Sequence, residues 1–112
     1  MFIAENGLGT ADTIDPDGRI RDTARMEYLK KHIEALQQAV ADGCDIFGYT
    51  WWGPIDIVSA GTGEWKKRYG FIYVDKDNQG NGTLQRRKKD SFEYYKKVIA
   101  SNGQDLELPA ED

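Results

Sequence analysis

Glu5 is the first residue whose type and setting could carry chemistry. It follows a short apolar run, residues 2–4, and precedes Asn6 and Gly7. A strand ordinarily ends on a turn residue, so a carboxylate here has two interpretations. It is either a solvated acid at a frayed terminus or a catalytic carboxylate at the carboxyl end of a strand, where parallel α/β proteins place their active sites. The dipeptide Glu-Asn is too short to decide between them.

A second group of chemically capable side chains follows in the middle of the chain. Trp51 and Trp52 are adjacent, and Ser59, Lys67 and Tyr69 come soon after. Adjacent strand residues point to opposite faces, so the two indoles should face different surroundings. One of them could be a platform for the apolar face of a sugar. The serine, lysine and tyrosine are suitable donors for a phosphate. In the structural alternative, the tryptophans are core and the basic cluster is a solvated surface.

Composition limits the class of protein. The 112 residues carry a net charge of −4, which argues against nucleic acid and membrane surfaces as partners. The single cysteine, Cys44, cannot form a disulfide within the chain and favours a reducing, cytoplasmic location. No run approaches the ~20 apolar residues of a membrane span. No ligand cluster predicts a metal, and no cofactor is expected.

Regular elements must position these side chains. Apolar periodicity and turn residues predict strand 2–5, loop 7–21, a helix from Asp22 to Gly43, strand 45–52, loop 53–69, strand 71–74, turn 77–83, strand 84–86, and a helix from Asp90 to Gly103. The predicted apolar faces of the helices are Met26, Leu29, Ile33, Leu36 and Val40, then Phe92, Tyr95 and Ile99. Cys44 is expected to be a small core residue, and residues 86–89 a solvated turn.

The order of elements indicates an α/β protein with a parallel sheet. The chain has only two β/α units, and two parallel strands bury little, so it is expected to be a piece of something larger. Both long loops follow the carboxyl ends of their strands.

Three motifs resemble family 1 glycoside hydrolases, in the 6-phospho-β-glucosidase branch. Residues 3–7, Ile-Ala-Glu-Asn-Gly, are similar to the nucleophile motif of the family. Residues 48–52, Gly-Tyr-Thr-Trp-Trp, are similar to its eighth strand, and residues 67–75 to its Lys-Arg-Phe/Tyr-Gly-x-x-Tyr-Val-Asp segment. The resemblance runs from Met1 to about Leu108, in family order and spacing.

The resemblance implies a partial TIM (β/α)8 barrel. The chain would supply strands 7 and 8 with their helices and a small hairpin. Residues 1–112 would form the C-terminal quarter of the barrel domain, with about 104–112 as a loosely ordered tail. It also implies hydrolysis of 6-phospho-β-glucosides with retention of configuration.

The resemblance also implies roles for individual residues. Glu5 would be the nucleophile and Trp52 the sugar platform, while Ser59, Lys67 and Tyr69 would hold the 6-phosphate. Ordinary β-glucosidases have a glutamate at the position of Ser59, and that carboxylate would repel a phosphate dianion.

One catalytic group of the family is not found in the sequence. The acid/base of the family lies in an Asn-Glu-Pro motif, which this chain lacks. The isolated chain is therefore expected to be inactive, and to form a homo-oligomer that covers its exposed barrel edges. Two alternatives remain open: a fragment of a non-phospho β-glucosidase, or a non-catalytic sugar-phosphate-binding oligomer.

Overall fold

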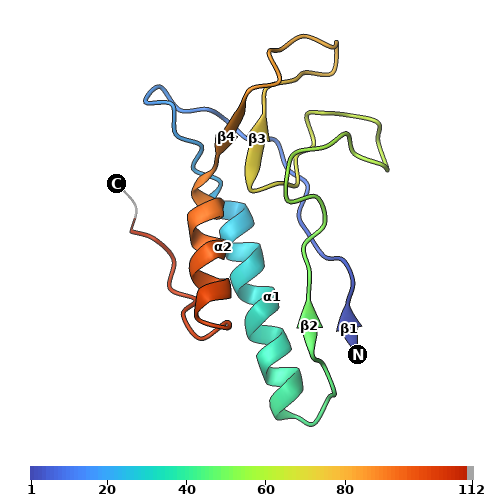
Figure 1. Cartoon of the computed structure of the whole chain (residues 1–112), viewed down its shortest axis with the longest axis vertical. Helices are drawn as coiled ribbons and strands as arrows, with labels where there is room; N and C mark the ends of the chain where they lie inside the picture. Colours follow the sequence, from blue (N-terminus) through green and yellow to red (C-terminus); the bar gives the residue numbers. More distant parts are fainter. Residues whose placement is uncertain (111–112) are drawn as a thin grey trace.

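The computed structural model describes residues 1–110 and is mixed α/β (Figure 1). Its elements are, in chain order, β1 (Phe2–Ile3), α1 (Thr23–Ala41), β2 (Gly48–Tyr49), β3 (Ile72–Val74), β4 (Arg86–Lys88) and α2 (Asp90–Ala100). Both helices were predicted close to these bounds, and α2 begins at the predicted residue. Gly43 and Gly103 follow the helix ends with φ of 100° and 77°, values that favour glycine.

Strands β1 and β2 pair in parallel, as predicted. Phe2 lies opposite Gly48 and Ile3 opposite Tyr49. Backbone hydrogen bonds extend the contact at both ends, from Phe47 N to Met1 O and from Trp52 N to Asn6 O. The two runs therefore finish side by side, which brings the residues that follow them together.

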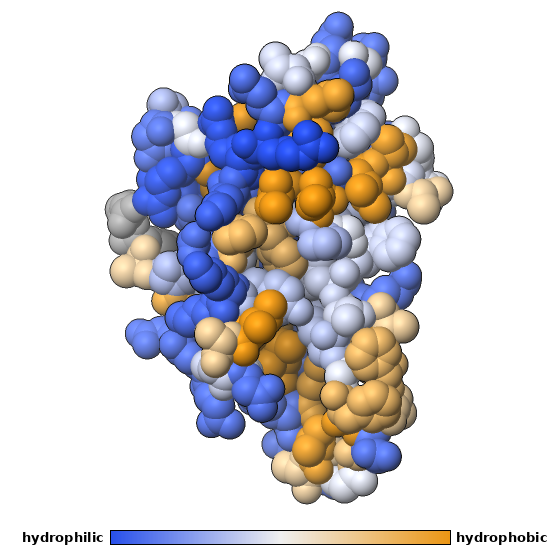
Figure 2. All heavy atoms as spheres, in the orientation of Figure 1, coloured by the Kyte–Doolittle hydropathy of each residue, from blue (hydrophilic) through white to orange (hydrophobic). Residues whose placement is uncertain are grey.

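Strand β2 and the residue before it are not buried on both faces. Phe47 is 76% exposed and stacks only on Phe2, itself 48% exposed. Figure 2 shows hydrophobic residues gathered at the β1–β2 end of the molecule. The cause is that the sheet has two strands, so nothing in the described residues covers its outer side.

Helices α1 and α2 pack side by side against the loops (Figure 1). The buried core cluster is Met26, Leu29, Trp51, Phe71, Tyr94 and Val98. Helix α1 extends beyond α2, so Val40, at the end of the predicted stripe, is 49% exposed. The predicted face of α2 is partly wrong: Tyr94 and Val98 are buried, whereas Ile99 is 63% exposed. Cys44 is also exposed rather than in the core.

A β-hairpin and the C-terminal segment complete the fold. Strands β3 and β4 pair antiparallel, with Tyr73 opposite Arg87. Residues 104–110 have no regular secondary structure, but Leu106 and Leu108 pack against the core cluster. The Tyr94 hydroxyl donates to Leu106 O at 2.9 Å. Residues 111–112, the last of the expected tail, lie outside the described residues.

Candidate active site

Glu5 lies at the carboxyl end of β1, with its side chain exposed at an open cavity. The volume of this cavity is about 390 Å³, and its lining residues are Glu5, Asn6, Gly7, Trp52, Ala60, Gly61 and Tyr69. Three of the five predicted site residues therefore border one cavity, although they are far apart in the sequence. We call it the Glu5 cavity.

The backbone beside Glu5 is fixed by Asn6. The Asn6 carbonyl accepts from Trp52 N at 2.8 Å. Its side-chain oxygen accepts from the Tyr49 hydroxyl at 2.8 Å, and its Nδ2 donates to the Tyr28 hydroxyl at 3.2 Å. Burial raises the pKa of Tyr49, which keeps this hydroxyl a donor. The carboxylate thus projects from a rigid strand end.

The two tryptophans divide between core and cavity, as their adjacency predicted. Trp51 is 8% exposed, and its Nε1 donates to Tyr69 O at 2.7 Å. Trp52 is 39% exposed and borders the Glu5 cavity. An indole in this position can stack on a sugar ring.

Ser59 and Lys67 lie next to Tyr69, which borders the Glu5 cavity, but neither lines that cavity itself; we call the three residues the donor cluster. The pKa of the Tyr69 hydroxyl is lowered, mainly by a hydrogen bond with Ser59 and to a smaller extent by one with Lys67. The Lys67 ammonium lies 5.8 Å from the centre of the Tyr69 ring. Ser59 is 1% exposed and starts a tight turn, with its carbonyl accepting from Gly63 N at 2.7 Å. The Tyr69 hydroxyl and the Lys67 ammonium suit an anionic ligand, whereas Ser59 is buried and contacts Tyr69.

The side chain between Lys67 and Tyr69 points the other way, into the protein. Arg68 is 7% exposed, and its Nε lies 3.1 Å from a carboxylate oxygen of Asp56. Its terminal nitrogens donate to the carbonyls of Trp65, Val74 and Lys76 at 3.1, 3.1 and 2.8 Å. Alternation along an extended segment therefore anchors residue 68 and turns residues 67 and 69 to the opposite side, where Tyr69 borders the cavity.

Asp56 is buried behind the donor cluster, and its carboxylate makes several hydrogen bonds and ion pairs. Its carboxylate accepts from Gly70 N at 3.0 Å and Val74 N at 3.3 Å. It also pairs with the Lys89 ammonium at 2.8 Å. The expected solvated turn over residues 86–89 is wrong, because residues 86–88 are exposed but form β4, and Lys89 is 2% exposed. A buried lysine needs a charged partner, and Asp56 lies 33 positions away in the sequence.

Further pairs extend this buried ionic network. The Lys89 ammonium also contacts Asp12 at 2.6 Å, and Arg25 contacts Asp12 at 3.1 Å and Asp22 at 2.6 Å. Its members are Asp12, Asp22, Arg25, Asp56, Arg68 and Lys89. Three carboxylates thus balance three cations. Sequence reasoning missed the network because its pairs join distant segments.

The two long loops meet at Thr10 and Arg68. Thr10 N donates to Arg68 O and Arg68 N donates to Thr10 O, both at 2.9 Å. An Arg25 guanidinium nitrogen donates to the same Arg68 carbonyl at 2.8 Å. The loop after β1 is therefore fixed against the donor cluster.

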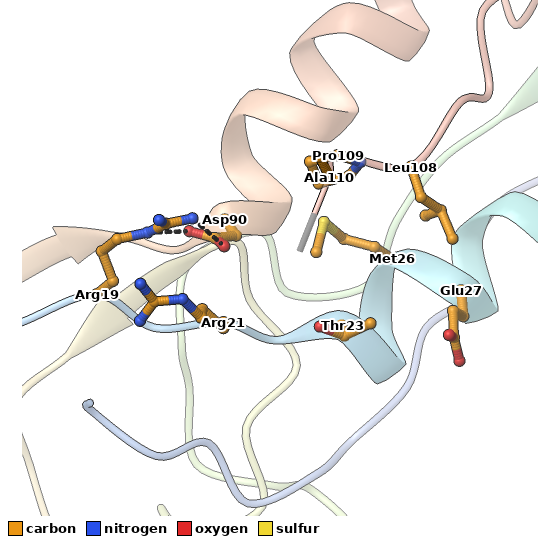
Figure 3. Close-up of a pocket in the computed structure, with 9 residues that line it drawn as sticks. All are labelled: Arg19, Arg21, Thr23, Met26, Glu27, Asp90, Leu108, Pro109 and Ala110. Atoms are coloured by element: carbon orange, nitrogen blue, oxygen red, sulfur yellow. Dashed lines mark hydrogen bonds and ion pairs between the residues drawn. The ribbon is translucent and has the colours of Figure 1, made fainter. Parts of the chain in front are cut away.

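A separate cavity of about 280 Å³ lies between the starts of both helices and the C-terminal segment (Figure 3). Its arginines face carboxylates: Arg19 pairs with Asp90 at 2.9 Å, and Arg21 with Asp15 and Asp17, both at 2.7 Å. None of the predicted site residues lines this cavity.

Residues 1–110 contain no group of three or more His, Cys, Asp or Glu side chains that could hold a metal ion. None of the described helices is long and apolar enough to span a membrane.

Comparison with known proteins identifies the class. Residues 1–104 match glycosyl hydrolase family 1, and the chain belongs to this family. Aryl-phospho-β-D-glucosidase BglA of Bacillus subtilis (strain 168) is 62% identical over 107 residues, and 6-phospho-β-glucosidase AscB of Escherichia coli (strain K12) is 58% identical over 107 residues. These alignments cover 95% and 96% of this chain, but 22% and 23% of the relatives. The chain thus spans less than a quarter of their length, and the resemblance predicted from its motifs is confirmed.

A solved structure agrees with the family. The family 1 β-glucosidase from Thermotoga maritima matches with a TM-score of 0.81 and 36% identity. The match covers 93% of this chain and 22% of that chain. The fold is therefore that of part of a family 1 β-glucosidase.

Proposed function

We propose that this chain supplies the nucleophile and the phosphate-binding side of an enzyme that hydrolyses 6-phospho-β-glucosides with retention of configuration. The observation that carries the proposal is the 62% identity to a phospho-β-glucosidase over 95% of the chain. The contacts of Ser59 and Lys67 with Tyr69, which shares a cavity with Glu5, support it.

In this proposal Glu5 forms the glycosyl-enzyme. Its carboxylate attacks the anomeric carbon, the bond to the aglycone oxygen breaks, and water later releases the sugar. Retaining enzymes need a second carboxyl group about 5–5.5 Å away to protonate the aglycone and activate the water. That acid/base would come from the longer enzyme, so the chain alone is inactive. The exposed strand end and the rigid backbone beside Glu5 support this role.

The remaining site residues select the substrate. Trp52 stacks on the sugar ring, and Ser59, Lys67 and Tyr69 bind its 6-phosphate. In the full barrel, β1 and β2 correspond to strands 7 and 8. In the full barrel, neighbouring strands would cover the apolar surface around Phe2 and Phe47. In the isolated chain, other copies of the chain would cover this surface.

Two other functions have some support. The match to the Thermotoga maritima β-glucosidase is compatible with a non-phosphorylated substrate. The missing acid/base is compatible with a non-catalytic sugar-phosphate-binding oligomer. Ser59 stands where ordinary β-glucosidases have a glutamate, and the donor cluster contains the cation Lys67. Both features favour the phosphorylated substrate.

A hybrid enzyme tests the proposal. The segment of BglA that matches this chain is exchanged for residues 1–112, which supplies the remaining barrel. We expect the hybrid to hydrolyse p-nitrophenyl 6-phospho-β-glucoside far better than p-nitrophenyl β-glucoside. Equal rates on both substrates would favour the plain β-glucosidase. A folded hybrid without activity on either, whose chain still binds glucose 6-phosphate, would favour the non-catalytic function.

Removing the positive charge of the donor cluster should weaken substrate binding. In the hybrid, Lys67→Met is expected to raise KM for the phosphorylated substrate roughly ten- to a hundredfold, the value of a charge-assisted hydrogen bond. Lys66→Met is the matched control, because Lys66 is exposed and lines a different cavity. Steady-state kinetics on both substrates measure the effect. Equal losses in the two variants would contradict the assignment of Lys67.

The lowered pKa of Tyr69 predicts a pH dependence. A neutral hydroxyl can donate to a phosphate, whereas a tyrosinate repels it. As pH rises through the lowered pKa, kcat/KM for the phosphorylated substrate should fall, starting below the usual tyrosine pKa of about 10. In the Tyr69→Phe hybrid the part of this fall that is due to Tyr69 should be absent, while the part that is due to the acid/base remains. Identical profiles for parent and variant would show that Tyr69 does not bind the phosphate.

A further inference from the structure

Gly9 lies in the loop after β1, opposite Tyr69. The antiparallel bridge between Thr10 and Arg68 sets this register, because the residue before one partner faces the residue after the other. Side chains alternate along paired segments, so position 9 faces the same side as Lys67 and Tyr69, away from the buried Arg68. The bridge therefore brings the backbone of one loop against the donor cluster of the other.

The space above Gly9 is filled by the ends of two donor side chains. A Cβ at this position would lie 2.6 Å from Tyr69 Cζ, the atom that carries the hydroxyl, and 2.8 Å from Lys67 Cε, the atom that carries the ammonium. Both distances are far below van der Waals contact. The φ of Gly9 is outside the left-handed region, so the backbone does not require glycine. What requires glycine here is the closeness of these two side chains.

From this geometry we propose that Gly9 is a specificity-determining residue for the phosphorylated substrate. Its missing side chain lets the Tyr69 hydroxyl and the Lys67 ammonium converge beside Glu5. A methyl group at position 9 would push these flexible side chains outward and separate the donors, while leaving Glu5 and Trp52 in place. The inference rests on the proposed function. It adds Gly9, in the loop after the strand of Glu5, as a residue that selects the phosphorylated substrate.

The test is Gly9→Ala in the BglA hybrid. Lys66→Ala is the control, because Lys66 is exposed, precedes Lys67 in the same loop and does not line the Glu5 cavity. We expect Gly9→Ala to raise KM for p-nitrophenyl 6-phospho-β-glucoside roughly ten- to a hundredfold, the effect of an ångström-scale misplacement. Its kcat/KM for p-nitrophenyl β-glucoside should stay unchanged, which also shows that the variant is folded. Lys66→Ala should change neither value.

A double-mutant comparison separates a local from a general effect. In a Tyr69→Ala/Lys67→Ala background the added methyl group has nothing to displace, so Gly9→Ala should have no further effect on KM. If the parent hybrid prefers the phosphorylated substrate and the Gly9→Ala variant keeps that preference, the role of Gly9 is overturned but the proposed function is not. A Gly9→Ala variant that loses both activities equally would also overturn the role of Gly9. A parent hybrid without the preference would overturn the proposed function and this inference together.

Discussion

Glu5→Gln in the BglA hybrid is expected to abolish hydrolysis of p-nitrophenyl 6-phospho-β-glucoside. Glutamine has nearly the same shape, but its neutral amide cannot form the glycosyl-enzyme. Loss of a nucleophile that acts as a unit with other groups lowers kcat by about 10⁴-fold or more. Substrate binding should persist, because Trp52 and the donor cluster are unchanged. Release of p-nitrophenolate and binding of glucose 6-phosphate measure the two effects separately.

A control and a rescue make this prediction specific. Glu64→Gln changes an acid in the second loop and should leave kcat unaltered. Glu5→Ala opens space beside the sugar, so added azide should attack the anomeric carbon from the side of the missing carboxylate. The new C–N bond forms as the bond to p-nitrophenolate breaks, and the product is the α-glycosyl azide. A Glu5→Gln hybrid within about tenfold of the parent rate would exclude Glu5 as the nucleophile.

Local sequence patterns predicted the elements of the fold well. The apolar stripe and the glycine after it located α1, and Asp90 was correctly predicted as the start of α2. The parallel pairing of β1 and β2 was also predicted. The errors concern strand bounds, as for β4, expected over residues 84–86 and found at Arg86–Lys88, and burial, as at Ile99 and Cys44. Burial depends on what packs against an element, and a pattern within the element does not contain that information.

The candidate site was predictable for residues that lie within recognisable motifs. Trp52 and Tyr69 were predicted from sequence, and both border the Glu5 cavity. Their support was not predictable, because Asp56 and Lys89 pair across 33 positions. Gly9 was also missed: its role depends on the close approach of two side chains from the other long loop. A charged residue inside a basic run gives no local sign that it is buried.

Asp56→Asn is expected to destabilise the chain strongly. The substitution keeps the size of the side chain but leaves the buried Arg68 without its carboxylate and the buried Lys89 with Asp12 alone. Breaking a buried ion pair from one side typically costs roughly 3–5 kcal/mol. That is a large part of the roughly 5–15 kcal/mol that stabilises a whole domain. Urea unfolding of the 112-residue chain, followed by tryptophan fluorescence at matched concentration, measures the loss.

An exposed pair provides the comparison for this prediction. Glu93 lies 3.9 Å from Lys88, both side chains are 64% exposed, and Glu93→Gln should cost less than about 1 kcal/mol. Lys89→Met should cost less in the Asp56→Asn background than in the parent, because it then removes a cation that has lost one of its two carboxylates. If Asp56→Asn unfolds at the same urea concentration as Glu93→Gln, the network does not stabilise the fold. The loop of Lys67 and Tyr69 would then owe its position to the Thr10–Arg68 backbone pairing instead.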